Sequence, residues 1–277
     1  MTAKVKTKSQ VDRTLQLEKA RDVLKIALAG KSPRARGDEK MRLALDWVYR
    51  WGWSSSSTLE IIGGANRSGL AARLVKRGLL RSTATENGGA QKGIPAAILT
   101  LTETGQQEVE SFREDLIQYE RDPYRIRQDQ LRHYQIAQTA TANALKLKTI
   151  TGFMTELESL KKSKSGIKQP DIIWYTENGR MGIEVELSAK WGRQMDQFIV
   201  SCIASLVGDP PMLNEIAIIS NSPAIIKRYK NEFKIGAKVN IWKKEIKEEK
   251  IGDWKITETK TIPNSIEGKL FWKPINY

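Results

Sequence analysis

Two acidic residues stand out within an apolar stretch of the chain. Glu184 and Glu186 alternate with Ile183, Val185 and Leu187. In a β-strand, residues two positions apart project from the same face, so the two carboxylates would point in one direction. Burying two like charges is costly unless a cation neutralises them. The spacing therefore predicts a carboxylate site for a cation, with a structural salt-bridge network as the alternative.

A predicted β-hairpin brings a third acid to the same place. Two β-like runs, 171–175 and 180–187, flank the turn Glu177-Asn178-Gly179, and Asn-Gly is the strongest short signal for a hairpin. We expect the hairpin to set Asp171 beside Glu184. The predicted metal ligands share hard oxygen atoms: Asp171, Glu184, Glu186 and the backbone carbonyl of Val185. Such ligands favour Mg²⁺ or Mn²⁺, which can activate water and balance charge on a phosphodiester.

A lysine and several other polar residues are further candidates. Lys190 follows the second acid by four residues, where the strand is expected to give way to a helix. Its ammonium group would stabilise a phosphate under attack. Tyr134 and Tyr175 are candidate nucleophiles for a covalent mechanism, but their spacing selects neither. Glu156 and Glu158 precede the hairpin, and we interpret them as a solvated helix face rather than as site acids.

The composition excludes several other kinds of site. The 277 residues include one His and one Cys, and 46 Lys+Arg against 32 Asp+Glu give a net charge of +14. A structural zinc site and disulfides within the chain are therefore excluded, which fits a reducing cytoplasm. Since no apolar run is long enough to span a bilayer, we expect a soluble cytoplasmic protein with no membrane partner. The positive surplus favours a polyanion such as DNA, with a merely basic protein as the alternative.

The elements expected in the first half have the order of a winged helix-turn-helix domain. The predicted helices lie at 41–51, 58–62 and 66–77, and the predicted strands at 79–85 and 94–102. In that motif the third helix enters a major groove and the hairpin touches phosphate. The predicted DNA contacts lie on this helix and hairpin: Arg67, Ser68, Arg73, Lys76, Arg77 and Lys92. A protein-interaction module is the alternative.

The second half is predicted to be an α/β sheet with covered faces, so the fold class is α+β overall. A long helical stretch, 104–147, is predicted to break at Asp122-Pro123, so that 104–120 closes the winged domain and 124–147 leads into the second half. Further helices are predicted at 149–160, 191–206 and 222–233. Besides the hairpin, strands are predicted at 215–220 and 238–242. The domains are a basic extension 1–37, with disordered ends 3–9 and 30–37 around a helix 11–28, a winged-helix domain 38–121 and an α/β domain 122–277. Residues 245–277 receive no assignment. Trp254 and Trp272 in this lysine-rich tail are interpreted as packing anchors, with stacking on single-stranded bases as the alternative.

The hairpin resembles the PD-(D/E)xK nuclease superfamily. Pro170-Asp171 matches the PD element, and Glu184 matches the acidic strand residue. The family's lysine, two positions after that acid, is replaced here by Glu186. The resemblance implies that either Lys190 supplies the missing cation or the site has lost activity.

A wider resemblance covers residues 38–245. The chain is similar to MobC-type relaxases of mobilisable plasmids in three motifs: His133-Tyr-Gln-Ile-Ala-Gln138 (HxxxxQ), Pro170-Asp171 and Glu184-x-Glu186-x-x-x-Lys190. This resemblance implies a winged helix ahead of a restriction-endonuclease-like domain. It also implies Mg²⁺- or Mn²⁺-dependent nicking of one DNA strand at an origin of transfer, with His133 and Gln138 as helpers to the catalytic acids and Lys190.

The implied partners are double-stranded DNA and its nicked or single-stranded product. Other relaxosome proteins and a coupling ATPase are candidate protein partners. Two alternatives stay open, namely another PD-(D/E)xK endonuclease, such as a transposon end-cleaving or restriction-type enzyme, and a non-catalytic DNA-binding replication or transfer factor. The displaced lysine motivates the second alternative. The oligomeric state is not predicted.

Overall fold

The computed structural model describes residues 30–64, 69–159, 169–247 and 250–275. Four predictions lie outside these ranges: the disordered segment 3–9, the helix 11–28, and the DNA contacts Arg67 and Ser68. The described part is a mixed α+β structure with a mixed sheet, in agreement with the predicted class. Within it, no helix has the length and apolar character needed to cross a bilayer.

The first half, as described, contains helices followed by an antiparallel strand pair, in the predicted order. Its elements are α2 (Pro33–Trp51), α3 (Ser56–Ile62), α4 (Leu70–Lys76), β1 (Leu80–Ala84), β2 (Ala97–Leu101) and α5 (Glu103–Glu110). Helix α2 ends where predicted, because Gly52 adopts a left-handed conformation with φ of 79°. Leu45, Leu59 and Leu80 pack together in the core of this half.

The start of α2 corrects one prediction. Disorder is predicted over 30–37, yet the helix begins at Pro33. The Ser32 side chain accepts a hydrogen bond from the Ala35 amide at 3.1 Å, and Pro33 occupies the first helical position. A capping serine followed by proline fixes a helix start, and this outweighs the glycines of the stretch.

A five-stranded mixed sheet forms the centre of the second half, with strand order β3-β4-β5-β6-β9. The strands are β3 (Gly152–Thr155), β4 (Ile172–Thr176), β5 (Gly179–Val185), β6 (Glu215–Ser220) and β9 (Leu270–Pro274). β3, β4 and β5 pair antiparallel, whereas β5, β6 and β9 pair parallel. The predicted hairpin 171–187 is confirmed as β4 and β5, and the predicted strand 215–220 as β6.

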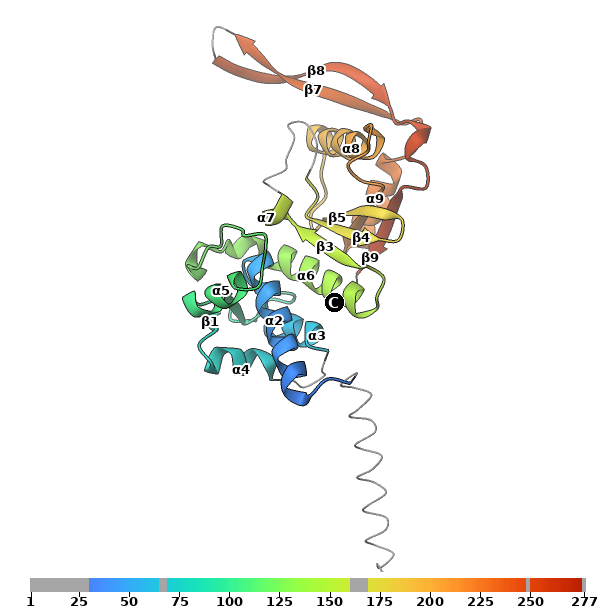
Figure 1. The fold of residues 1–277 in the computed structure, drawn as a ribbon. Helices are drawn as coiled ribbons and strands as arrows, with labels where there is room; N and C mark the ends of the chain where they lie inside the picture. Colours follow the sequence, from blue (N-terminus) through green and yellow to red (C-terminus); the bar gives the residue numbers. More distant parts are fainter. Residues whose placement is uncertain (1–29, 65–68, 160–168, 248–249, 276–277) are drawn as a thin grey trace, which may run out of the picture.

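Helices cover both faces of this sheet (Figure 1). They are α6 (Leu131–Lys146) on one face and α8 (Gly192–Val207) and α9 (Pro223–Glu232) on the other. Ile172 and Ile183 share a core with α6, while Ile173 and Ile218 share a core with α8 and α9. Alternate residues of the central strands therefore face opposite helical layers.

Two predicted helices are shorter than expected. α5 ends at Glu110 rather than 120, and α6 begins at Leu131 rather than 124, after the 3-10 turns η1 (Pro123–Arg125) and η2 (Gln128–Gln130). Tertiary contacts hold the segment between them: the Tyr119 hydroxyl donates to the Gly52 carbonyl at 2.9 Å and accepts from the Leu101 amide at 2.8 Å. These hydrogen bonds join residues far apart in the sequence, so local periodicity does not reveal them.

The predicted helix 149–160 is wrong. Its residues form strand β3 and the short helix α7 (Glu156–Ser159). Phe153 pairs with Trp174 of β4, and the Phe153 side chain is buried. Pairing with a neighbouring strand outweighs local helix propensity here.

The C-terminal part holds a long hairpin that the sequence analysis did not assign. β7 (Lys238–Lys247) extends beyond the predicted strand 238–242 and pairs antiparallel with β8 (Lys250–Thr261). In Figure 1 this hairpin lies beyond α8, away from the first half. The Trp242 indole donates to the Asp196 carboxylate of α8 at 2.7 Å, which anchors the hairpin to that helix. The 3-10 turn η4 (Asn264–Ile266) then leads into β9.

One hydrophobic core joins residues from both sides of the predicted boundary at residue 121. Trp47 of α2 and Phe153 of β3 belong to it, and their ring centroids are 5.1 Å apart. Ile136 of α6 and Val185 of β5 belong to the same core. The two halves are therefore packed against each other rather than joined by a linker alone.

Candidate active site

The hairpin register brings Asp171 and Glu184 together as predicted. Ile172 pairs with Ile183, so Asp171, the residue before β4, stands opposite Glu184. The Asp171 carboxylate accepts a hydrogen bond from the Val185 amide at 2.7 Å. Asp171 is therefore fixed at the edge of the ladder, beside the strand that carries the other two acids.

Glu184 and Glu186 are buried on the face of the sheet that α8 and α9 cover. They are 3% and 5% exposed, respectively. Ile183 and Val185, which alternate with them, belong to the core on the α6 face. Burial raises the pKa of Tyr229 on α9, and the negative charges of Glu186 and Glu184 raise it further. Both carboxylates therefore lie near the Tyr229 hydroxyl.

Lys190 reaches Glu186, as the four-residue spacing suggests. Its ammonium group pairs with Oε1 of Glu186. The Glu186 side chain is 6% exposed, whereas that of Lys190 is 31% exposed. The cation therefore stands between a buried acid and the surface, where a phosphate could approach it.

Tyr229 is the member of the site that the sequence analysis missed. Its hydroxyl donates to Oε2 of Glu186 at 2.9 Å and accepts from the Lys190 amide at 3.4 Å. Tyr229 lies on α9, and no local spacing connects it to the hairpin. Only the packing of α9 on the sheet reveals this contact.

His133 joins the acids from α6. Its Nε2 atom lies 3.1 Å from Oδ2 of Asp171. Burial alone would lower the pKa of His133, but the hydrogen bond to Asp171 and the charges of Asp171 and Glu186 outweigh it, so the pKa is raised. We call the residues brought together here the acid cluster: His133, Asp171, Glu184, Glu186, Lys190 and Tyr229.

Gln138 lies apart from the acid cluster. It follows His133 by five positions, which places it about 140° away around α6. Its Oε1 accepts from the Trp47 indole at 3.1 Å and from the Ser54 hydroxyl at 2.8 Å, and its Nε2 donates to the Trp53 carbonyl at 3.0 Å. We call Gln138, Trp47, Trp53 and Ser54 the amide joint, because they tie α6 to the first half.

A cavity of about 180 Å³ opens beside Asp171 at the junction of the two halves. Tyr134, Glu156 and Arg127 also line it. The Tyr134 hydroxyl donates to Oε2 of Glu156 at 2.8 Å, and burial together with the Glu156 charge raises the pKa of Tyr134. Tyr134 is therefore a hydrogen-bond donor beside the acid cluster, and Tyr175 lies elsewhere, on the cavity described next.

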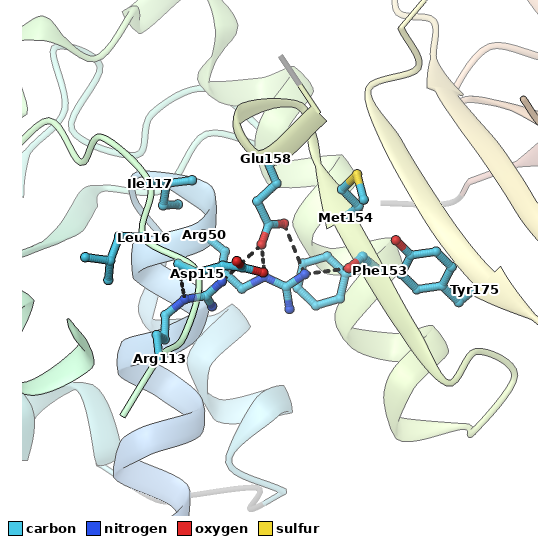
Figure 2. Close-up of a pocket in the computed structure, with 9 residues that line it drawn as sticks. All are labelled: Arg50, Arg113, Asp115, Leu116, Ile117, Phe153, Met154, Glu158 and Tyr175. Atoms are coloured by element: carbon cyan, nitrogen blue, oxygen red, sulfur yellow. Dashed lines mark hydrogen bonds and ion pairs between the residues drawn. The ribbon is translucent and has the colours of Figure 1, made fainter. Parts of the chain in front are cut away.

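A second cavity, of about 280 Å³, contains Glu158 rather than the acid cluster. Figure 2 shows Arg50 and Arg113 directed toward the Glu158 carboxylate. The nitrogen–oxygen distances are 2.8 Å to Arg50 and 3.5 Å to Arg113, and the Glu158 side chain is 15% exposed. The interpretation of Glu158 as part of a solvated helix face is therefore wrong. Arg50 lies 108 residues away in the sequence, so no local pattern indicates the pairing.

The described DNA-contact candidates lie on the surface of the first half. Arg73, Lys76 and Arg77 are exposed on and just after α4, while Leu74 between them is buried. Lys92 is exposed in the loop between β1 and β2. The positions agree with the predicted helix and hairpin, and DNA contact itself stays a prediction.

The acid cluster offers oxygen donors for a hard cation, but few of its carboxylates are candidates for ligands. Among the described residues, no group of three or more His, Cys, Asp or Glu side chains is arranged to hold a metal ion. Glu186 is engaged by Lys190 and Tyr229. Mg²⁺ commonly uses one or two carboxylates with water and substrate phosphate. Asp171 and Glu184, which the hairpin register sets side by side, would supply that smaller set of oxygen ligands together with the Val185 carbonyl.

Comparison with family models, with curated proteins and with solved structures finds no match to this chain. The resemblance to relaxases therefore rests on its short motifs alone.

Proposed function

We propose that the protein is a metal-dependent endonuclease that nicks one strand of DNA. The observation that carries this proposal is the hairpin register, which sets Asp171 opposite Glu184, while Lys190 pairs with Glu186 two residues further along the chain. Two carboxylates at one strand edge, beside a partly exposed ammonium group, suit phosphodiester hydrolysis. The surplus of positive charge, +14, favours the DNA substrate.

Each residue of the acid cluster has a distinct task in this proposal. Asp171 and Glu184 hold Mg²⁺ or Mn²⁺, which when bound supplies an activated water and charge balance at the phosphate. Lys190 holds its ammonium group toward the phosphate, and Glu186 keeps that group in place. Tyr229 in turn holds Glu186 through its hydroxyl and accepts from the Lys190 backbone amide. His133 fixes the Asp171 carboxylate through its hydrogen bond.

The order of elements supports a PD-(D/E)xK type of nuclease domain. Helix α6 precedes three antiparallel strands, and α8 then connects to a parallel strand, β6. The order of elements in the first half, with its exposed Arg73 and Lys92, supports a winged helix that holds DNA. From the resemblance we take the nick to fall at an origin of transfer, where relaxosome proteins and a coupling ATPase would be the partners.

A second function is favoured by one observation. Both oxygens of Glu186 are engaged, and this acid stands where the nuclease pattern has lysine. A protein with this arrangement would bind DNA through its first half without cutting it. A replication or transfer accessory factor is therefore the alternative.

The test is nicking of supercoiled plasmid that carries the DNA adjacent to this gene, with Mg²⁺ or Mn²⁺. We expect open-circular product from the wild type and a loss of at least about 100-fold in the Asp171→Asn and Glu184→Gln variants. Glu177→Gln is the matched control, because Glu177 is an exposed acid in the turn of the same hairpin. It should nick at the wild-type rate.

Three outcomes would contradict the proposal in different ways. A wild type that binds the plasmid but gives no open-circular product supports the accessory factor. Nicking that survives in both variants shows that the site is elsewhere. Linear product as the first species indicates an enzyme that cuts both strands.

A further inference from the structure

Trp191 is an exposed tryptophan immediately after the candidate catalytic lysine. It is 64% exposed, although tryptophan side chains are usually largely buried. It precedes Gly192, the first residue of α8, and follows Lys190 of the acid cluster. A large aromatic surface is therefore presented to solvent beside the proposed site of cleavage.

One face of the Trp191 ring is covered by a guanidinium group. The Cζ atom of Arg228 lies 3.6 Å from the ring centroid. Arg228 is itself held, because its Nε donates to the Lys190 carbonyl at 3.2 Å and its Nη2 pairs with Glu232 at 3.2 Å. The arginine therefore fixes the plane of the indole and leaves the exposed surface on its other side.

Cations and aromatic rings alternate around this position. Arg193, two residues further along, lies with its Cζ atom 4.2 Å from the ring centroid of Trp254 on β8. Lys244 of β7 also approaches Trp254, at 5.4 Å. This combination is typical of surfaces that bind single-stranded nucleic acid, because cations hold the backbone and rings stack on bases.

We propose that Trp191 stacks on an unpaired base of the single-stranded DNA next to the nick. This inference rests on the proposed function, since it places the base beside Lys190. Bases within a duplex are stacked on one another and present only their edges, so an exposed ring selects an unpaired base. A protein partner would require a contiguous apolar patch, whereas Trp191 is flanked by Lys190, Arg193 and Arg228.

The test measures equilibrium binding of the full chain to a labelled single-stranded DNA of about 20 nucleotides and to its duplex, without divalent metal. Trp191→Ala should weaken single-strand binding about 5-fold to 150-fold and leave duplex binding unchanged. Trp191→Phe should restore most of the affinity, because it keeps an aromatic face. The slope of log affinity against log salt should stay that of the wild type, because no phosphate contact is removed.

Leu147→Ala is the matched control for loss of an exposed apolar side chain, since Leu147 is 73% exposed at the end of α6. It should bind both DNAs like the wild type. The inference is overturned if Trp191→Ala binds single strands normally, if it loses single-strand and duplex binding equally, or if the wild type does not bind single strands. Tighter binding of the same sequence as RNA would assign the ring to RNA and also overturn it.

These results separate the two proposals. If the wild type nicks plasmid and Trp191→Ala binds single strands normally, the stacking role is contradicted and the endonuclease proposal stands. If single-strand binding depends on Trp191 but the wild type does not nick, the endonuclease proposal is contradicted and the stacking role stands.

Discussion

The acid cluster and the amide joint are both buried polar clusters that involve α6, yet they differ in charge. In the amide joint, Gln138 is fully buried, and the groups it contacts are neutral. In the acid cluster, Glu186 is buried with an ammonium group as partner, and Asp171 contacts an imidazole. The HxxxxQ motif contributes one residue to each cluster.

The difference indicates which buried polar groups hold the fold and which are available for chemistry. A neutral cluster whose donors and acceptors are paired gains rigidity at little electrostatic cost. A cluster of carboxylates with a partly exposed cation keeps charge that a metal ion or a phosphate can use. We therefore expect changes in the acid cluster to alter activity and changes in the amide joint to alter stability.

The largest expected effect is that of Glu186→Gln on nicking. The amide would still accept a hydrogen bond from Tyr229, but Lys190 would lose its ionic partner and its position. We expect nicking to fall by at least about 100-fold, as in the Asp171→Asn and Glu184→Gln variants. Because the shape is kept, the free energy of unfolding should change by no more than about 1 kcal/mol.

Plasmid nicking rates and urea unfolding of the same preparation measure both quantities. Glu177→Gln again serves as the control acid. If the Glu186→Gln variant nicks normally, or loses activity only because it unfolds, the acid cluster does not differ from the amide joint in affecting activity.

The next largest effect is that of Gln138→Leu on stability. This change leaves the Trp47 indole and the Ser54 hydroxyl buried without their acceptor, and each such group costs about 1–3 kcal/mol. We expect the free energy of unfolding to fall by about 3 kcal/mol. The folded fraction should still nick at the wild-type rate.

Urea unfolding followed by tryptophan fluorescence measures this loss. Gln194→Leu is the matched control, because Gln194 is an exposed amide on α8 and its replacement should change stability by less than about 0.5 kcal/mol. Wild-type stability in Gln138→Leu would show that the amide joint does not hold the halves together.

The smallest effect is a dependence of stability on pH that only the acid cluster should show. The folded-state pKa of His133 is raised above the value of about 6.5 found in unfolded chains. The protonated ring therefore stabilises the fold fully below about pH 6.5, and this contribution is lost as pH rises through the raised pKa. His133 is the sole histidine of the chain, which makes the assignment direct.

Urea unfolding in metal-free buffer, over a pH series from about 5.5 to 8.5, tests this dependence. The wild type should lose stability toward the alkaline end, and His133→Gln should lose less. Gln138→Leu should keep the wild-type dependence. Equal pH profiles for wild type and His133→Gln would contradict the role of the His133–Asp171 pair.

Local sequence patterns predicted the parts of the site that depend on local geometry. The Asn178-Gly179 turn fixed the hairpin and thereby placed Asp171 opposite Glu184, and a spacing of four residues brought Lys190 to Glu186. Tyr229 was not predictable, because it reaches Glu186 only through the packing of α9. The five-residue spacing of the HxxxxQ motif puts His133 and Gln138 on different faces of a helix, but which face meets the acids depends on how α6 packs.

The same difference between local patterns and long-range contacts explains which elements of the fold were predicted. β5 and β6 have apolar runs bounded by turn residues, so they were predicted, as was the end of α2 at Gly52. β3 was not predicted, because its assignment depends on its pairing with β4. β8 and β9 lie in a polar, lysine-rich part of the chain whose strands are defined by their partners.

In the proposed nuclease, the amide joint and the core shared by the two halves would also set where along a DNA molecule the cut falls. Helix α4 and Asp171 belong to halves that are packed together, so the offset between them is built into the structure. DNA held by α4 would therefore be cleaved at a constant number of base pairs from the bound sequence. Lengthening the DNA between the bound sequence and the cleavage position would therefore abolish cleavage instead of shifting it.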